Sequence, residues 1–201
     1  MSSAPYPPER IADLTLTVQS ADMVRIFDRK YRDNPLGTGP GDSRLCAKAD
    51  NYHVLYASPD FTTSFLETVV RDRYARPKPA AERKLFYREI SMRVSANLMV
   101  PNTESLNLLD LRGDGCVRLG VGTDAIRAED HGEGRTLGRN LHDDPANLDG
   151  ILFSSRLTGQ DVYAIFDRAT NKLIAETARE LSDDMRLPEI LDRYGITLIR
   201  S

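Results

Sequence analysis

The chain has 201 residues, of which 40% are hydrophobic and 28% are charged, and its net charge is −3 at pH 7. This size and composition are typical of one globular domain with a proper hydrophobic core, and the weakly acidic balance argues against a protein that binds nucleic acid over its whole surface. The sequence has no apolar run long enough to span a bilayer and no opening signal segment, so we expect a cytoplasmic protein.

The distribution of charged residues indicates where an anionic ligand could bind, and the two cysteines indicate the redox compartment. Residues 1–100 carry 15 Lys and Arg against 12 Asp and Glu, whereas residues 101–201 carry 12 against 18. The first half is therefore better suited to receive an anionic ligand. Cys46 and Cys116 lack the spacing of metal ligands, and a reducing compartment is a simpler interpretation than a disulfide between them.

The first forty residues predict short strands separated by loops. Residues 1–10 are rich in proline and should be loose or extended. Within residues 11–20 the run LTLTV alternates like a short strand, and residues 23–27 predict a better one. Arg25 interrupts that second run, so it is either a snorkelling side chain or a buried cation with an anionic partner. Residues 34–43 predict a loop, which is either a plain surface loop or one whose N–H groups approach a phosphate.

Residues 44–71 are the most informative stretch of the chain. The alternating aromatic and branched residues at 52–56 predict a strand that ends in Tyr56. Ser58 has the residue type of a helix N-cap, and Pro59 that of the first helical position. The helix that follows has an apolar side (Phe61, Phe65, Leu66, Val69 and Val70) and a polar side (Asp60, Thr63, Glu67 and Arg71). The polar side either lines a cleft or is a solvated face on which Glu67 and Arg71 form an ordinary ion pair.

The rest of the chain predicts more strands than helices. The predicted strands are 84–95 (with a shift of alternation at a bulge), 106–111, 150–154, 162–166 and 196–199. The predicted helices are 136–142 and 185–194, and 76–83 is a linker-like turn. Thr158 and Gly159 lie between two of the strands, so these strands form a hairpin. The order of elements predicts the α+β fold class, with a compact mixed sheet and flanking helices.

One ordered set of segments carries a resemblance to a known family. It consists of Arg25 in VRIF, the glycine- and proline-rich loop, Arg44, the run HVLYASPDFTTSFLETVVR with Glu67, and the later run DGILFSSR with Ser155. In this order the segments resemble the RES domain, which is named for a shared arginine, glutamate and serine. The resemblance implies the toxin half of a bacterial toxin–antitoxin pair, with a fold related to ADP-ribosyltransferase toxins.

The resemblance also implies the domain boundaries. We expect a single domain over residues 1–201, with a core at about 23–168, an N-terminal extension at 1–20, and a C-terminal helix and strand at 169–201.

The same resemblance implies that NAD is the substrate. Cleavage of the nicotinamide–ribose bond passes through an oxocarbenium-like state, which a nearby carboxylate stabilises, and Glu67 matches that role. Arg25 and Arg44 match the planar cations that bind a pyrophosphate. Many members carry an aromatic residue after the first arginine, whereas this chain has Ile26. The role of stacking on nicotinamide therefore passes to Tyr56.

The serine role has more than one candidate. Ser155 can hydrogen-bond a ribose or phosphate oxygen, but Ser154 is adjacent, and a slip of one residue would exchange the two. Thr136, just before the short predicted helix, is the second choice beside Ser155. No metal is expected, because the three histidines (His53, His131 and His142) lack metal-ligand spacing, and a surface or core role suits them better.

These inferences give one hypothesis and two alternatives. The hypothesis is a toxin that cleaves NAD and mono-ADP-ribosylates a host protein, a choice of acceptor that rests on fold kinship alone. The first alternative is an NAD phosphorylase that uses inorganic phosphate as acceptor. The second is a non-catalytic nucleotide- or partner-binding module. Separately, each residue has a structural alternative: an ion pair for Arg25, a cap of the loop for Arg44 and a place in the core for Tyr56. An antitoxin with a DNA-binding domain is the expected partner and should cover the active site.

Overall fold

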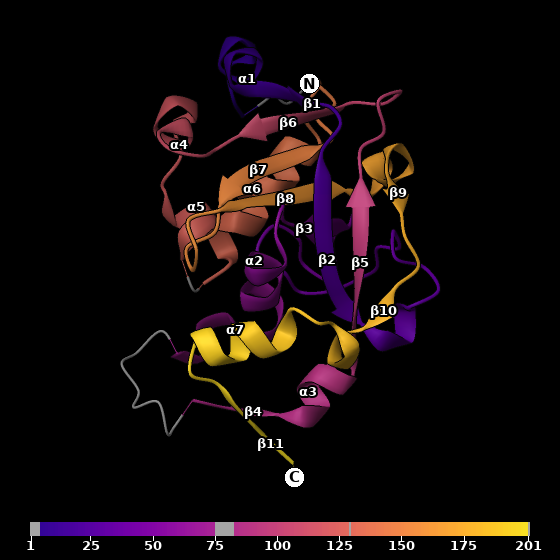
Figure 1. Cartoon of the computed structure of the whole chain (residues 1–201). Coiled ribbons are helices and arrows are strands. Elements are labelled where there is room, and N and C mark those ends of the chain that lie inside the picture. The colour runs from indigo at the N-terminus through magenta and orange to yellow at the C-terminus, as the bar shows by residue number, and fades with distance from the viewer. Residues whose placement is uncertain (1–4, 75–82, 129, 201) are drawn as a thin grey trace.

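A five-stranded mixed sheet forms the centre of the protein (Figure 1). The computed structural model describes residues 5–74, 83–128 and 130–200. The spatial order of the strands is β1 (Thr15–Val18), β6 (Leu106–Asp110), β7 (Gly150–Ser154), β8 (Asp161–Phe166) and β3 (Val54–Ala57). β6 and β7 are parallel, and the other neighbours are antiparallel. β7 and β8 are the predicted hairpin, which is confirmed.

A second sheet packs on one face of the first. Its main pair is β2 (Asp22–Asp28) with β5 (Arg93–Met99), and β5 also pairs with β9 (Ile174–Ala175) and β10 (Arg179–Glu180). Met23 and Phe27 of β2 share one buried apolar cluster with Leu152 and Ile165 of the five-stranded sheet. Burial of such side chains is the main favourable term in folding. The two sheets are therefore held together by a continuous core.

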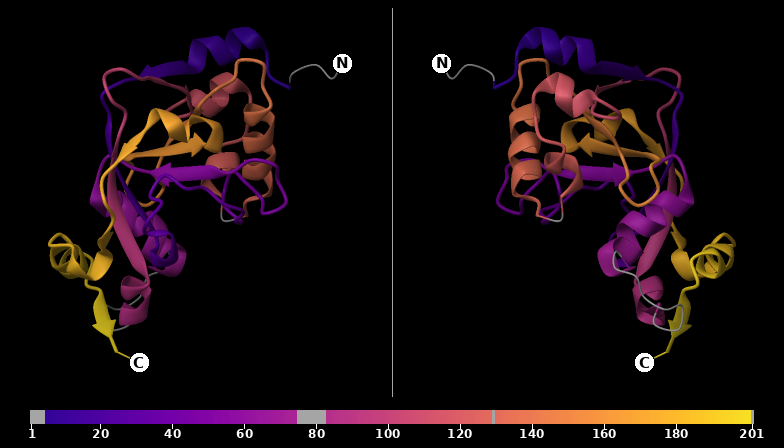
Figure 2. Two further views of the ribbon diagram at one scale, coloured as in Figure 1. Left: turned by 90° about the vertical axis from the view of Figure 1, so that its right-hand side faces the viewer. Right: turned by 90° about the vertical axis from the view of Figure 1, so that its left-hand side faces the viewer.

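Helices cover the two outer faces, so the α+β fold class predicted from the sequence is confirmed. A second apolar cluster packs the five-stranded sheet against α1 (Pro8–Leu14), α4 (Gly115–Leu119), α5 (Asp124–Arg127) and α6 (Gly132–His142). A third cluster packs β2 against α2 (Phe61–Phe65), α3 (Tyr87–Ser91), α7 (Leu187–Arg193), β4 (Lys84–Phe86) and β11 (Thr197–Ile199). Figure 2 shows these last elements gathered at the end of the molecule that carries the C-terminus.

The segment that follows α2 is irregular. A π-helical turn, Leu66–Val70, continues α2 directly, and a 3₁₀ turn, Arg71–Tyr74, follows. Further 3₁₀ turns lie at Arg29–Tyr31, Asp167–Lys172 and Leu181–Asp183. The five residues predicted for the apolar side, Phe61, Phe65, Leu66, Val69 and Val70, are all buried, so this prediction is confirmed. A π-turn shifts the positions of the residues after it, and such turns are frequent at functional sites.

The prediction that the helix starts at Ser58 and Pro59 was wrong. Asp60 is the N-cap of α2, and its side chain accepts a hydrogen bond from the backbone N–H of Thr63 at 2.8 Å. A carboxylate is as good an N-cap as a serine hydroxyl, and this one lies where the chain turns into the helix. The hydroxyl of Ser58 instead lies 2.7 Å from that of Ser64.

The long strand predicted over residues 84–95 was also wrong, because α3 separates β4 from β5. The side chain of Glu89 accepts a hydrogen bond from the backbone N–H of Phe86 at 3.1 Å, which stabilises the helix start. Ile90 on this helix is fully buried. The chain therefore forms a helical turn where the sequence predicts a bulged strand, and the contact of Glu89 and the burial of Ile90 stabilise this turn.

The remaining predictions differ mainly at their boundaries. Residues 8–10 belong to α1 rather than to a loose segment, and Pro8 occupies its first turn, which suits the fixed φ of proline. The helix predicted at 136–142 begins earlier, at Gly132. The linker predicted at 76–83 lies almost entirely outside the described residues.

Two kinds of feature are absent from the described residues, a membrane-spanning helix and a group of metal ligands. No helix among them has the length and apolar composition needed to cross a membrane. In the same part of the chain no three or more His, Cys, Asp or Glu side chains gather as a metal site would require.

Two glycines on one side of α6 bring this helix close to the loop around Arg44. A Cβ atom at Gly134 would lie 2.5 Å from the carbonyl oxygen of Arg44, and one at Gly138 would lie 2.0 Å from that of Leu45. Real Cβ atoms do not approach backbone oxygens so closely, so only glycine permits this packing. α6 therefore sets the position of the backbone that carries Arg44.

We predict that Gly138→Ala destabilises the protein by about 1–3 kcal/mol, because the new methyl group must displace the backbone of Leu45. Urea denaturation measures the change. Thr136→Ala on the same helix is the control, since Thr136 is exposed and its hydroxyl donates only to the carbonyl of Gly132. That change should stay within about 0.5 kcal/mol of the parent. Equal stability of the two variants would contradict the close approach.

Candidate functional site

A cavity of about 360 Å³ lies where β2, β3 and the segment from α2 to Arg71 meet. Among the described residues, its walls carry five arginines, Arg25, Arg44, Arg71, Arg93 and Arg156, and two carboxylates, Asp42 and Glu67. Other lining groups include Tyr56, Ser58, Thr63, Ser64, His131 and Phe153. The volume lies in the range of small-molecule sites, and the excess of arginine suits an anionic ligand.

A buried hydrogen-bonded junction ties the walls together. Val24 of β2 and Ser58 after β3 exchange backbone hydrogen bonds of 2.7 and 3.1 Å. The hydroxyl of Ser64 on α2 donates to the carbonyl of Val24 at 2.6 Å and lies 2.7 Å from the hydroxyl of Ser58. Both serine side chains are thereby satisfied although they are buried. The junction fixes β2, β3 and α2 relative to one another.

Glu67 and Ser155 meet at the wall of this cavity. The hydroxyl of Ser155 donates to Oε1 of Glu67 at 2.6 Å, and it accepts hydrogen bonds from the backbone N–H groups of Leu157 and Thr158 at 3.1 and 3.2 Å. Ser155 is 3% exposed, and these contacts use its single proton and its acceptor capacity. Within the described residues the other carboxylate oxygen of Glu67 has no hydrogen-bond donor. Ser155 therefore orients Glu67 and leaves one oxygen for a ligand.

Arg25 is a largely buried cation. Its Nη1 donates to the carbonyl of Pro35 at 2.5 Å, and its guanidinium lies 4.8 Å from the ring centre of Phe27. No carboxylate among the described residues pairs with it. Burial lowers the pKa of Arg25 to about 10, and no other charged group contributes to that shift. The buried-cation alternative thus fits, but within the part of the chain that the structure describes its anionic partner is absent.

Arg44 belongs to a separate group of charges. Its Nη1 donates to the carbonyl of Ala128 at 2.6 Å. Its pKa is lowered, first by burial and then by Arg156, while Glu67 acts in the opposite direction. Arg44, Arg156 and Glu67 line the same cavity and influence one another electrostatically, and Arg25 lines this cavity from β2.

Tyr56 holds the loop that carries Arg44. Its phenol oxygen accepts a hydrogen bond from the backbone N–H of Leu45 at 3.1 Å and lies 3.1 Å from the hydroxyl of Ser43. Burial raises the pKa of Tyr56 to about 12, so the phenol stays protonated at neutral pH. The hydroxyl thus acts on the two residues that flank Arg44, and Tyr56 is itself one of the residues that line the cavity.

Three cavity residues were not assigned a role from the sequence. Arg71 lies on the polar side of the helix, for which the sequence leaves two interpretations open, a cleft wall or an ordinary ion pair with Glu67, and no such pair exists among the described residues. Arg156 ends the DGILFSSR run and could have been noticed there. Arg93 lies in the stretch that was taken for one long strand, and no signal in the sequence marks it.

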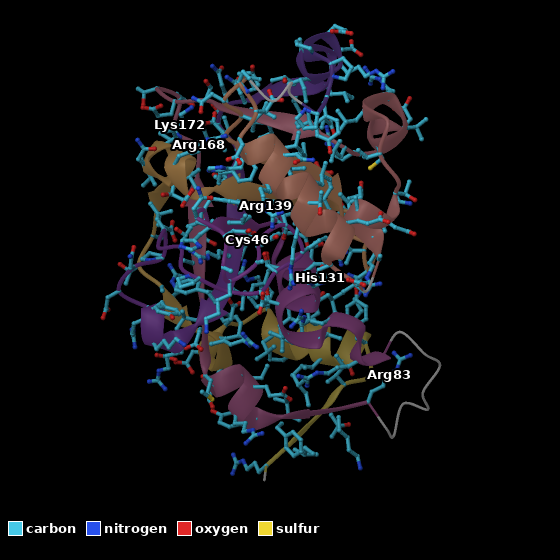
Figure 3. All side chains as sticks on the ribbon, turned by 180° about the vertical axis from the view of Figure 1, so that it is seen from behind. Cys46, Arg83, His131, Arg139, Arg168 and Lys172 are labelled. Atoms are coloured by element: carbon cyan, nitrogen blue, oxygen red, sulfur yellow. The ribbon has the colours of Figure 1, made fainter. Side chains whose placement is uncertain are left out.

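The other candidates lie away from this cavity. Thr136 is exposed on α6 and does not line it, and Ser154 pairs with Asp161 at the end of β7. Of the histidines, His131 lines the cavity (Figure 3), although we expected only a surface or core role. Burial, Arg44 and other arginines lower the pKa of His131, so its ring is neutral at neutral pH. His142 instead stacks on Tyr52, with ring centres 4.3 Å apart.

We predict that Tyr56→Phe loosens the loop around Arg44 while the apolar core remains intact. The change leaves the Leu45 N–H without its acceptor, which costs about 1–3 kcal/mol. Hydrogen exchange of the Leu45 amide should become faster, and denaturation should report lower stability. Tyr163→Phe is the matched control, because the hydroxyl of Tyr163 makes no hydrogen bond to the described residues. Unchanged exchange at Leu45 in Tyr56→Phe would contradict this role.

Comparison with known proteins places the chain in a family. The sequence matches the RES domain over residues 22–188. It is 38% identical over 97 residues to the probable toxin y4kH of Sinorhizobium fredii (strain NBRC 101917 / NGR234), an alignment that covers 48% of this chain and 76% of that protein. Its fold is similar to a chain in the crystal structure of the M. tuberculosis MbcT–MbcA toxin–antitoxin complex, with a TM-score of 0.60, 15% identity, and coverage of 86% of this chain and 90% of the other. The chain belongs to the RES domain family.

Proposed function

We propose that this protein is the toxin of a toxin–antitoxin pair, which binds NAD, cleaves its nicotinamide–ribose bond and transfers ADP-ribose to an acceptor. The observation that carries the proposal is the carboxylate of Glu67, which Ser155 orients at the wall of a cavity lined by five arginines. The relative named as a probable toxin and the fold shared with a chain of a toxin–antitoxin complex support the biological part of the proposal.

The charges of the cavity match the charges of NAD and of its reaction. The pyrophosphate is an anion that guanidinium groups bind well, and Arg25 and the group around Arg44 supply such cations. Nicotinamide leaves as a neutral molecule, so no strong general acid is required. Positive charge then develops on the ribose, as in glycoside hydrolysis, and a carboxylate nearby stabilises it. Glu67 is the carboxylate with a free oxygen in this position.

The reaction can be written with Glu67 acting electrostatically. The bond between the ribose C1 and the nicotinamide nitrogen breaks, and its electron pair neutralises the pyridinium ring. An acceptor oxygen or nitrogen forms the new bond to C1 and loses a proton. Glu67 stabilises the ribose cation through its oxygen Oε2 and can accept a hydrogen bond from a ribose hydroxyl, while Ser155 holds Oε1. Tyr56 offers part of its ring to the nicotinamide.

We propose a protein side chain as the acceptor, which makes the activity mono-ADP-ribosylation of a host protein and rests on kinship to ADP-ribosyltransferase toxins. Phosphorolysis by inorganic phosphate is the second candidate, and one observation favours it. Among the described residues that line the cavity, arginines outnumber carboxylates five to two, and still four to two without Arg156, whereas NAD itself carries a net charge of only about −1. A bound NAD molecule leaves positive charge that an anionic acceptor would neutralise.

We predict that Glu67→Gln abolishes most of the activity and leaves the fold intact. Glutamine keeps the shape and can still accept the hydrogen bond of Ser155, but the charge that stabilises the ribose cation is gone. Release of nicotinamide from NAD should fall about a hundredfold to a thousandfold, with little change in melting temperature or in NAD affinity. A near-parental rate would remove the central residue of the proposal.

A second pair of variants separates orientation from charge. Ser155→Ala keeps the carboxylate of Glu67 but removes the hydrogen bond that orients it. The rate of nicotinamide release should therefore fall by less than in Glu67→Gln, up to about a hundredfold. Ser154→Ala, at the neighbouring position, is the control and should behave like the parent. If no variant and no parent protein releases nicotinamide, the chain is a non-catalytic binding module.

We further propose that an antitoxin with a DNA-binding domain covers the cavity, since an active NAD consumer would harm its own host. The expected result is that a DNA-binding protein encoded beside this chain co-purifies with it and suppresses nicotinamide release. Size-exclusion chromatography of the co-expressed pair measures the association. An adjacent DNA-binding protein that elutes separately would exclude this partner.

A further inference from the structure

Arg71 adopts a backbone conformation that suits glycine rather than arginine. Its φ is 52° and its ψ is −136°, at the point where the π-turn ends and the 3₁₀ turn begins. A side chain with a Cβ atom is strained in this region, and such strain persists where the surrounding structure or the function requires it. The strained residue lines the cavity. An arginine is thus retained where a glycine would fold more easily.

Arg71 lies among other cations and has no partner of opposite charge. No carboxylate among the described residues lies within ion-pair distance of its guanidinium. Like Arg44, Arg93 and His131, it lines the cavity, and its charge lowers the pKa of each of these three groups. The described lining carries more arginines than carboxylates, so its like charges repel one another and disfavour the empty cavity.

Arg93 is the second cavity arginine without an ion pair among the described residues. Its Nε is buried and has no hydrogen-bond acceptor in the same part of the chain. Asp28 lies opposite Arg93 in the β2–β5 pair, and Asp28 and Glu89 both oppose the lowering of its pKa. Asp28 instead accepts a hydrogen bond from the N–H of Lys30, and Glu89 binds Arg73 and the N–H of Phe86. A buried donor without an acceptor is costly and is rare in native proteins. An anion in the cavity would offset the charges of Arg93 and Arg71 together.

We propose that Arg71 and Arg93 form a second oxyanion subsite, which binds a phosphate group separately from the anion bound at Arg25. Two guanidinium groups carry the charge that a phosphate dianion neutralises, and they present planar N–H donors that match its oxygens. This subsite rests on the second candidate of the proposed function, phosphorolysis, in which it holds the anionic acceptor in the same cavity as Glu67. The phosphate is either free inorganic phosphate or a phosphate ester of a larger molecule.

The test is a calorimetric titration of the full chain with inorganic phosphate and, in parallel, with ribose 5-phosphate, each without NAD. Arg71→Gly and Arg71→Ala should both weaken phosphate binding by about tenfold to a hundredfold, because each removes one charged hydrogen-bonding group. NAD affinity should stay within about twofold of the parent. Binding of the ester alone would assign the subsite to organic phosphates, and binding of inorganic phosphate would assign it to the free ion.

The two Arg71 variants also test the strain. Both lack the guanidinium, but only glycine relieves the backbone, so Arg71→Gly should melt at a temperature at least about 2 °C above that of Arg71→Ala. Arg25→Ala should show the converse pattern, with weakened NAD binding and retained phosphate binding. Arg179→Ala is the charge-matched control, since Arg179 is 76% exposed and does not line the cavity.

The negative outcomes are distinct. Absence of phosphate and ester binding by the parent, or unchanged binding by both Arg71 variants, would overturn the subsite. A loss of NAD affinity in Arg71→Gly as large as in Arg25→Ala would also overturn it, because Arg71 would then serve the pyrophosphate. Phosphate binding that depends on Arg71 in a protein without nicotinamide release would support the subsite and count against the proposed function.

Discussion

The cavity depends on the junction where Val24, Ser58 and Ser64 meet. Arg25 follows Val24 in β2, Tyr56 lies two residues before Ser58, and Glu67 follows Ser64 by three residues. Each junction residue is held by short hydrogen bonds in a buried setting, where a lost partner costs about 1–3 kcal/mol. The cation, the tyrosine and the carboxylate are therefore fixed relative to one another through the backbone. Long flexible side chains alone would not give that order.

Two further sets of contacts fix the other walls of the cavity, which are the loop around Arg44 and the turn after β7. The glycine side of α6 and the hydroxyl of Tyr56 hold the loop that carries Arg44. The turn after β7 is joined to α2 through the hydroxyls of Thr158 and Thr63, which lie 2.9 Å apart, and to the π-turn that continues α2 through Ser155 and Glu67. The functional groups thus come from both sheets, from the π-turn and from the loop that carries Arg44. This explains why segments so distant in the sequence must occur in one order to form one site.

Much of this arrangement follows from local patterns in the sequence. Alternation identified β1 and β3, short apolar runs identified β2, β7 and β8, and helical spacing identified the buried side of residues 61–70, because burial constrains residue type directly. The N-cap at Asp60 and the helix α3 were not predicted. In each case the sequence equally suited another structure, Ser58 as the N-cap or one continuous strand, and a single carboxylate contact stabilises the structure that forms. Arg71 and Arg93 were missed for another reason. Their significance lies in the absence of partners, which only the tertiary structure reveals.

The unpaired arginines also bear on stability. Burial lowers the pKa of Arg25 to about 10, below that of an arginine in the unfolded chain. At lower pH the side chain is charged in both states, so its burial destabilises the folded protein by a constant amount, on the order of 3 kcal/mol. Arg71 adds backbone strain, and Arg93 adds a buried N–H group without an acceptor among the described residues. An anionic ligand or acidic partner group that enters the cavity offsets the electrostatic part of these costs, so it binds more tightly than its own contacts imply. The excess of positive charge therefore favours occupation of this cavity by an anionic ligand, such as a nucleotide, or by a partner that brings acidic groups to its mouth.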